Sequence, residues 1–301
     1  MAPHPCPASM PHRARRAAAV SIAALTLLGF RTPNPGAPPF SVRVDCPPGE
    51  PCRSQPAGSE KPTRILGKSV LGRPIAAHRF GAGPTVRAVL AGIHGGYEGN
   101  TVALAEALIA HLTDHPQALP ADMTLWIVPV VNVDGFARAQ DSTGRANAHG
   151  VDINRNFPAL WQADWPRAGC WDMRPISAGE APGSEPETLA VMSFLLRQHV
   201  EALVSYHSAA PGIYSGGQPP DPRSEHLAQV LAAASGYAYP PVDTGCAFTG
   251  QLIDWAAANG IAAVDVELTT HSRSDLAQNL ALLEAFVAWS PADTAPASES
   301  R

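Results

Sequence analysis

Apolar residues recur along the chain in two patterns. Short apolar runs that end in glycine or polar residues predict buried strands, and they span residues 86–93, 123–131, 202–206 and 261–267. Longer segments with apolar residues at helical spacing predict helices over residues 100–112, 184–199, 224–235, 249–259 and 274–289. Strands that alternate with helices indicate an α/β fold class, with helices on both faces of a sheet.

The second predicted helix has a specific start signal. Ser184 and Glu187 have the spacing of a capping box, in which each side chain accepts from the backbone N–H of the other residue. We therefore expect Ser184 to be the N-cap of this helix.

Both ends of the chain depart from the alternation. Basic residues precede an apolar run over residues 17–30, which is the pattern of a secretory signal, so we expect a signal peptide over residues 1–37. Residues 38–62 are rich in proline, which discourages helix and sheet, and they predict a disordered linker. Residues 291–301 form a polar tail that predicts disorder as well. We expect the folded catalytic domain over residues 63–290.

Composition narrows the classes of function. The 301 residues carry a formal net charge of −5, which offers no basic footprint for nucleic acid. No apolar run reaches the roughly 20 residues of a membrane-spanning helix, so we expect no span in the mature protein. With a secretory signal, the expected location is outside the cytoplasm: secreted, periplasmic or in the cell envelope.

The cysteines fit an exported protein. Cys6 should leave with the signal peptide, and an even set of four then remains: Cys46, Cys52, Cys170 and Cys246. An even count in an exported chain favours disulfides. Cys46 and Cys52 enclose a short loop, so they are a plausible pair.

Three side chains with catalytic chemistry fall at the ends of predicted strands: His94, His207 and Glu267. In α/β sheets, ligands gather at the carboxyl ends of the strands. Two imidazoles and a carboxylate with an open fourth position are typical of catalytic zinc. The alternative for each histidine is an ordinary side chain with its hydrogen bonds satisfied. That interpretation holds for the histidines without a surrounding motif, which are His111, His115, His199 and His226.

A polar stretch over residues 150–158 places Arg155 between Asn154 and Asn156. A planar guanidinium suits the binding of a carboxylate through two parallel hydrogen bonds, whereas the alternative is a turn with its arginine in water. Together with other motifs, this stretch resembles the zinc carboxypeptidase family, over about residues 68–283. The motifs that carry the resemblance are Ile93–Thr101, Asn132–Phe136, Gly144–Asn147, Gly150–Pro158, Ser205–Ser208 and Val264–Leu268.

The resemblance implies a mixed, mostly parallel central sheet and one zinc ion per chain, bound by His94, Glu98 and His207. One feature departs from the family pattern, because three residues rather than two separate His94 from Glu98. Gly95 and Gly96 can adopt positive φ and let the loop bulge by one residue, so Glu98 stays the expected ligand.

The resemblance also implies the catalytic residues. Glu267 matches the general base, which accepts a proton from the attacking water and passes it to the leaving amine. Asp265 shares its face of the strand, so one of these two acids is alternatively a solvated side chain. Arg145 matches the arginine that stabilises the developing oxyanion, and its alternative is a loop arginine in water.

Substrate-binding residues follow from the same resemblance. Asn154 and Arg155 match the pair that binds the terminal carboxylate of the substrate. Ile253 matches the base of the side-chain pocket, and an apolar residue there favours an apolar or small side chain over a basic one. Tyr214 is expected near the site without an assigned role.

The mobile tyrosine of the family falls on Cys246 in this chain, and a thiol cannot replace a phenol. The resemblance places the loops of Cys170 and Cys246 together at the substrate pocket, so we expect a disulfide between them. Two separate buried thiols are the alternative.

The resemblance predicts a zinc metallopeptidase that acts on a peptide or muropeptide. The first hypothesis is a metallocarboxypeptidase that hydrolyses a C-terminal peptide bond with zinc-activated water. The second is a peptidoglycan stem-peptide amidase or endopeptidase, because the short connection from Arg145–Asn147 to Gly150–Asp152 resembles the murein peptide amidase branch. The third is an inert relative that only binds peptides or sugars.

Overall fold

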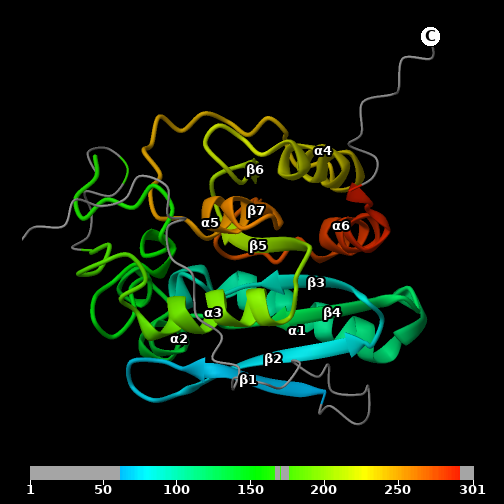
Figure 1. Cartoon of the computed structure of the whole chain (residues 1–301), viewed down its shortest axis with the longest axis horizontal. Coiled ribbons are helices and arrows are strands. Elements are labelled where there is room, and N and C mark those ends of the chain that lie inside the picture. Colours follow the sequence, from blue (N-terminus) through cyan, green and yellow to red (C-terminus); the bar gives the residue numbers. More distant parts are fainter. Residues whose placement is uncertain (1–61, 167–169, 171–175, 292–301) are drawn as a thin grey trace, which may run out of the picture. The chain divides into compact units, whose positions relative to one another are not determined.

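The computed structural model describes residues 62–166, 170 and 176–291, which contain a seven-stranded sheet (Figure 1). Its strand order is β1-β2-β4-β3-β5-β7-β6. The central strands β4, β3, β5 and β7 are parallel, and β1, β2 and β6 pair antiparallel toward the edges. The predicted mixed, mostly parallel sheet is confirmed. The strands are β1 Thr63–Lys68, β2 Pro74–Gly81, β3 Thr85–Leu90, β4 Met123–Val128, β5 Ala202–Ser208, β6 Gly212–Ser215 and β7 Ala262–Leu268.

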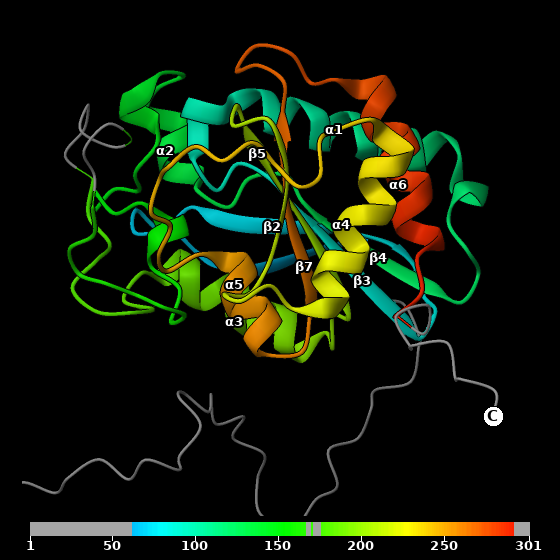
Figure 2. The ribbon, with the colours of Figure 1, turned by 90° about the horizontal axis from the view of Figure 1, so that it is seen from above.

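Helices cover both faces of the sheet (Figure 2), as the sequence predicts. Apolar residues of α1, α4 and α6 pack on one face, and those of α3 and α5 pack on the other. Along the buried strands, alternate residues enter the two cores, so Val204 faces the first helix group and Leu203 the second. The helices are α1 Gly99–Asp114, α2 Val133–Arg138, α3 Pro186–Arg197, α4 Pro222–Ser235, α5 Leu252–Ala258 and α6 Leu276–Ala288, with short 3₁₀ turns η1 Gly95–Glu98, η2 Pro116–Ala118, η3 Ser142–Gly144 and η4 Ile153–Arg155.

The parallel strands position the site. β5 is buried throughout, as expected of a strand covered on both faces. Its pairing with β7 sets His207 opposite Glu267 at the carboxyl ends of both strands. β3 pairs with β5 on the other side, and its last residue, Leu90, is aligned with Ser205. The chain that follows β3 therefore begins at the same edge of the sheet.

The sequence analysis predicts none of the strands β1, β2 and β6. β1 is mostly exposed, and β2 carries the polar side chains of His78 and Arg79. β6 has four residues. Strands near a sheet edge are often short or covered on one face only, so their apolar pattern is weak.

The predicted N-cap of the second helix is wrong. α3 begins at Pro186, its N-cap is Glu185, and the cap makes no side-chain hydrogen bond. Ser184 Oγ donates to Glu185 Oε1 at 2.8 Å and accepts from Asn156 Nδ2 at 3.1 Å. A tertiary partner has thus replaced the local capping box, and proline at the first helical position needs no N–H partner.

The expected signal peptide lies outside the described residues, as do Cys46, Cys52 and nearly all of the expected linker and C-terminal tail. Among the described helices, none has the length and apolar character needed to cross a membrane.

Candidate active site

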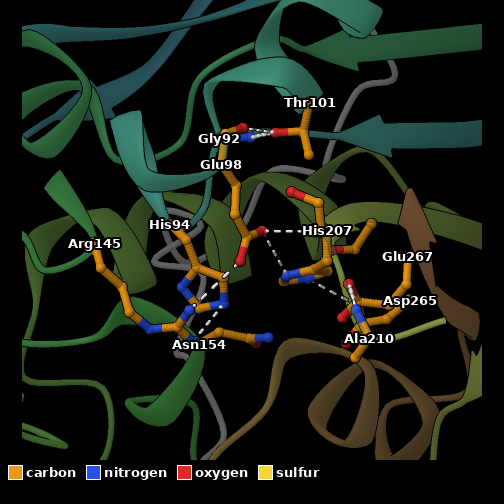
Figure 3. Close-up of polar contacts among 12 residues, drawn as sticks. Gly92, His94, Glu98, Thr101, Arg145, Asn154, His207, Ala210, Asp265 and Glu267 are labelled. Atoms are coloured by element: carbon orange, nitrogen blue, oxygen red, sulfur yellow. Dashed lines mark hydrogen bonds and ion pairs between the residues drawn. The ribbon is translucent and has the colours of Figure 1, made fainter. Parts of the chain in front are cut away.

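His94, Glu98 and His207 converge at the carboxyl edge of the sheet (Figure 3). His94 follows β3, Glu98 lies in η1, and His207 lies in β5. All three side chains are buried, and one potential ligand atom from each lies within 4.8 Å of the others. Two imidazoles and a carboxylate form the donor set that zinc prefers in catalytic sites, so these residues fit one zinc ion.

The extra residue between His94 and Glu98 is accommodated by the glycine pair. Gly95 has φ of +51°, and the backbone then makes the single 3₁₀ turn η1 that ends at Glu98. A Cβ on Gly96 would lie 1.8 Å from the carbonyl oxygen of Ala139, so only glycine fits there. Glu98 Oε2 accepts from the backbone N–H of Ser208 at 3.1 Å, which turns the carboxylate toward β5.

Two carboxylates lie behind the histidines. Asp152 Oδ1 lies 3.1 Å from His94 Nδ1, and Asp265 Oδ1 lies 3.3 Å from His207 Nε2. Outer carboxylates of this kind orient an imidazole and raise its basicity as a ligand. The sequence analysis gives Asp152 no role and leaves Asp265 open. The sequence held one indication of a role for Asp152, because this residue lies in the same motif as Arg155. The side chain of Asp152 also caps η4, however, as that of an ordinary turn residue would.

The charges around the cluster shift the pKa of its members. Burial would raise the pKa of Glu98, but His94, His207 and Arg145 together lower it to about 2. Burial would lower the pKa of His207, but Asp265 and Glu98 hold it well above its usual value. Glu98 is therefore ionised and attracts a divalent cation, whereas His207 releases its proton when it binds one.

Glu267 lies at the end of β7 and lines the same cavity as the cluster. Its Oε2 accepts from the backbone N–H of Ala210 at 2.9 Å (Figure 3). Burial raises the pKa of Glu267 to about 8, with further raising by Glu98 and Asp265 and an opposing effect of His207. A carboxylate with a raised pKa is a stronger proton acceptor, as a general base requires.

Arg145 reaches the cluster from the side of His94 (Figure 3). Its Nε donates to Asp152 Oδ2 at 2.9 Å, its NH1 to Glu98 Oε1 at 3.4 Å, and its NH2 lies 3.0 Å from His94 Nε2. The side chain is buried, and its charge faces the cavity of the cluster. The alternative of a loop arginine in water does not describe this residue.

Asn154 and Arg155 line the same cavity. Asn154 Oδ1 accepts from the backbone N–H of Leu252 at 2.8 Å, which ties η4 to the start of α5. The guanidinium of Arg155 is buried and lies over the ring of Phe248, 5.4 Å from its centroid. Burial lowers the pKa of Arg155 to about 10, so the group stays cationic at neutral pH.

Ile253 lies apart from this group. It lines a neighbouring cavity of about 470 Å³ with Tyr214 and Asp254, whereas the cavity of the metal cluster has a volume of about 200 Å³. Phe248 and Gln251 line both cavities and stand between them. The structure thus gathers seven of the eight expected site residues in one cavity: His94, Glu98, Arg145, Asn154, Arg155, His207 and Glu267.

The expected disulfide between Cys170 and Cys246 is present, with Cα atoms 5.9 Å apart. Cys246 lines the cavity beside Phe248, so the bond holds part of the cavity wall. The sequence analysis places the family tyrosine at this position, and a cross-linked residue there replaces a movable side chain.

Replacing both cysteines with serine should destabilise the fold. The bond spans a sequence separation of 76 residues, and the loop-entropy model gives about 4 kcal/mol of stabilisation for a loop of this size. Equilibrium unfolding in urea under non-reducing conditions measures the difference. An unchanged midpoint in the double variant would contradict the prediction, and the wild-type protein in reducing buffer is the control.

The chain is similar to a known protein family and to several known proteins. The family model described as zinc carboxypeptidase matches residues 61–285. Murein peptide amidase A of Escherichia coli K12 is 30% identical over 240 residues, which cover 77% of this chain and 91% of the relative. Gamma-D-glutamyl-L-diamino acid endopeptidase 1 of Lysinibacillus sphaericus is 26% identical over 155 residues, 44% of this chain and 38% of the relative.

Two solved structures support the fold. Murein-tripeptide amidase from Escherichia coli O157 superposes with a TM-score of 0.54 at 27% identity, covering 78% of this chain and 94% of that chain. Bovine thrombin-activatable fibrinolysis inhibitor superposes with a TM-score of 0.61 at 20% identity, covering 75% and 88%. The second likeness concerns the fold alone.

Proposed function

The chain belongs to the zinc carboxypeptidase family, and we propose that it hydrolyses the amide bond before the C-terminal residue of peptidoglycan stem peptides. The observation that carries the proposal is that Arg155 lines the same cavity as the metal cluster and Glu267. A carboxylate-binding arginine beside a hydrolytic centre selects a bond close to the free carboxyl end of a peptide.

Each group in the cavity has a part in the proposed reaction. His94, Glu98 and His207 would hold a zinc ion, which would supply an activated water and polarise the substrate carbonyl when bound. Glu267 accepts the proton of the attacking water at its carboxylate and donates it to the nitrogen of the leaving amine. Arg145 faces the cavity with a buried positive charge, which stabilises the oxygen that becomes negative.

The murein substrate class is supported by the relatives. A murein peptide amidase matches 77% of this chain, and a second relative is named for a γ-D-glutamyl–L-diamino acid bond. We therefore place the scissile bond between the γ-carboxyl of a D-glutamyl residue and a C-terminal diamino acid. Export, as expected from the N-terminal sequence, would bring the enzyme to such substrates and is part of this proposal. A metallocarboxypeptidase acting on ordinary peptides is the second candidate, supported by the same Arg155.

The substrate class is tested with two tripeptides and the zinc-loaded protein. One has a γ-D-glutamyl bond to a C-terminal diamino acid, and the other has the same length with α-peptide bonds between L-residues. Release of the diamino acid from the first alone supports the proposal. Release of a C-terminal residue from the second alone would instead support the ordinary carboxypeptidase. If neither tripeptide is cleaved, the result would support an inert relative that only binds its ligand.

Arg155 should set the requirement for a free carboxyl end. Converting the C-terminal carboxylate of a good substrate to an amide should lower kcat/KM about 10- to 100-fold in the wild type, because a hydrogen bond to a charged group contributes about 1.5–3 kcal/mol. The Arg155→Ala variant should lose most of this discrimination. Arg197→Ala, which alters an exposed arginine of α3, is the matched control. Equal sensitivity in wild type and Arg155→Ala would remove Arg155 from this role.

A further inference from the structure

Two further cavities adjoin the cavity of the metal cluster, and each shares two lining residues with it. The cavity of the metal cluster shares Phe248 and Gln251 with the cavity of about 470 Å³ that contains Ile253. It shares a different pair, Tyr97 and His271, with another cavity of about 560 Å³. The two outer cavities have no lining residue in common. The catalytic cavity therefore continues in two directions.

The wall between the catalytic cavity and the 560 Å³ cavity is held by hydrogen bonds. Tyr97 and His271 pack with ring centroids 4.7 Å apart. His271 Nδ1 lies 3.1 Å from Ser208 Oγ, and Ser208 Oγ donates to Asn100 Oδ1 at 2.9 Å. Asn100 Nδ2 donates to the carbonyl oxygens of Thr270 and Arg273, at 2.6 and 2.9 Å. This network fixes the position of His271 although its side chain reaches the surface.

Several polar side chains line the 560 Å³ cavity. Behind Tyr97 and His271 the lining consists of small residues and of side chains that form hydrogen bonds: Gly96, Gly99, Asn100, Ala103, Gln140, Asp141, Ser142 and Ser272. Asp141 accepts from the backbone N–H and the hydroxyl of Thr143, at 2.8 and 2.7 Å. A ligand with its own carboxylate would avoid Asp141 and would approach His271 instead.

The proposed function predicts which part of the substrate lies on each side of the catalytic cavity. Arg155 carries positive charge in the catalytic cavity, which Phe248 and Gln251 join to the 470 Å³ cavity, so the leaving residue lies on that side. The part of the substrate before the scissile bond must then extend past Tyr97 and His271. In a γ-glutamyl amide, the scissile carbonyl belongs to the side-chain carboxyl group, and the α-carboxylate stays free on this part of the substrate.

We propose that Tyr97 and His271, with the cavity behind them, form a subsite for the acyl part of the substrate, and that His271 donates to the free α-carboxylate of a γ-D-glutamyl residue. The inference rests on the proposed function and adds a specificity-determining residue to it. Ser208 Oγ donates its hydrogen to Asn100, so Nδ1 of His271 donates to Ser208 Oγ and Nε2 is the atom left for the ligand. Nε2 donates to the carboxylate when His271 is an imidazolium, in which both ring nitrogens carry hydrogen. An α-linked peptide has no main-chain carboxylate at this point, so this contact would favour γ-linked substrates.

The test compares two forms of one γ-D-glutamyl tripeptide, the first with a free glutamyl α-carboxylate and the second with an α-carboxamide there. The wild type should prefer the free acid in kcat/KM by about tenfold or more, the factor expected of one hydrogen bond to a charged group. His271→Ala should lose this preference, with turnover of the carboxamide changed less than about twofold. His271→Gln, which keeps a donor, should recover part of the preference. His115→Ala is the control, because His115 is exposed on the far end of α1.

The outcomes separate the two proposals. If both tripeptides are cleaved but the wild type does not discriminate, or if His271→Ala slows both equally, the subsite is overturned and the proposed function stands. If neither tripeptide is cleaved while an α-linked peptide is, the proposed function fails and the subsite fails with it. The zinc content of each variant, measured alongside, shows that a loss of preference does not come from a disturbed metal cluster.

Discussion

Replacing Glu267 with glutamine should abolish nearly all turnover while the protein keeps its zinc. An amide cannot accept the proton of the attacking water, and loss of a general base lowers kcat by about 10²- to 10⁴-fold. The amide has almost the same shape and can still accept from the N–H of Ala210, so the fold should stay intact. Steady-state kinetics and zinc analysis of the variant provide the measurement. Glu201→Gln, at an exposed position before β5, is the matched control.

The pH profile checks the same role independently. Burial raises the pKa of Glu267 to about 8, and the charge of a bound zinc ion would lower it again, toward the ordinary glutamate value of 4.5. Protonated Glu267 cannot act as a base. In the zinc-loaded enzyme, kcat/KM should therefore fall as pH decreases through the pKa that Glu267 has beside the bound zinc ion. The residual activity of Glu267→Gln should lack this acidic limb. A wild-type profile that stays flat below the ordinary glutamate pKa, or near wild-type turnover in the variant, would exclude Glu267 as the base.

Replacing His207 with alanine should remove the zinc and with it the activity. The variant loses one of three ligands, and it also leaves Asp265 without the imidazole that lies 3.3 Å away. Loss of an outer partner alone costs about 10- to 100-fold in metal affinity, so loss of a ligand should cost more. Zinc occupancy after dialysis should fall well below one per chain.

Two further variants define the metal cluster. Asp265→Asn should keep the ligand but weaken its orientation, so its zinc affinity should lie between those of wild type and His207→Ala. His115→Ala should bind zinc as the wild type does, because its exposed ring stacks on His111 at the end of α1. Full occupancy in His207→Ala would reject the assigned ligand set.

The sequence predicts those strands that are buried on both faces of the sheet, because such burial requires a run of apolar residues. β3, β4, β5 and β7 each appear as apolar runs, because parallel strands in the middle of a sheet contact helices on both sides. The sequence did not predict β1, β2 and β6, because solvent on one face or a short length removes that pattern. The capping box at Ser184 failed for a different reason. Asn156, which is 28 residues away, supplies a partner for the same hydroxyl.

The site was predictable as far as its residues lie in local motifs. His94, Arg145, Arg155, His207 and Glu267 each have a recognisable neighbourhood in the chain, and the structure brings them into one cavity. Ile253 was expected beside them from its motif as well, but Phe248 and Gln251 stand between its cavity and the metal cluster. Which side chains separate two cavities depends on packing between distant segments, and no local motif records that packing.

By itself, the sequence determined the order of the four buried parallel strands and of five α-helices along the chain, and the residue types available for zinc chemistry, because periodicity and motif spacing are local properties. Tertiary structure alone decided the contacts between distant segments. It set Asp152 and Asp265 behind the two histidines, and it fixed part of the cavity wall with the bond between Cys170 and Cys246. It also packed Tyr97 on His271 between the catalytic cavity and the 560 Å³ cavity. The physical reason is that each of these contacts exists only after parallel strands have brought their carboxyl ends to one edge of the sheet.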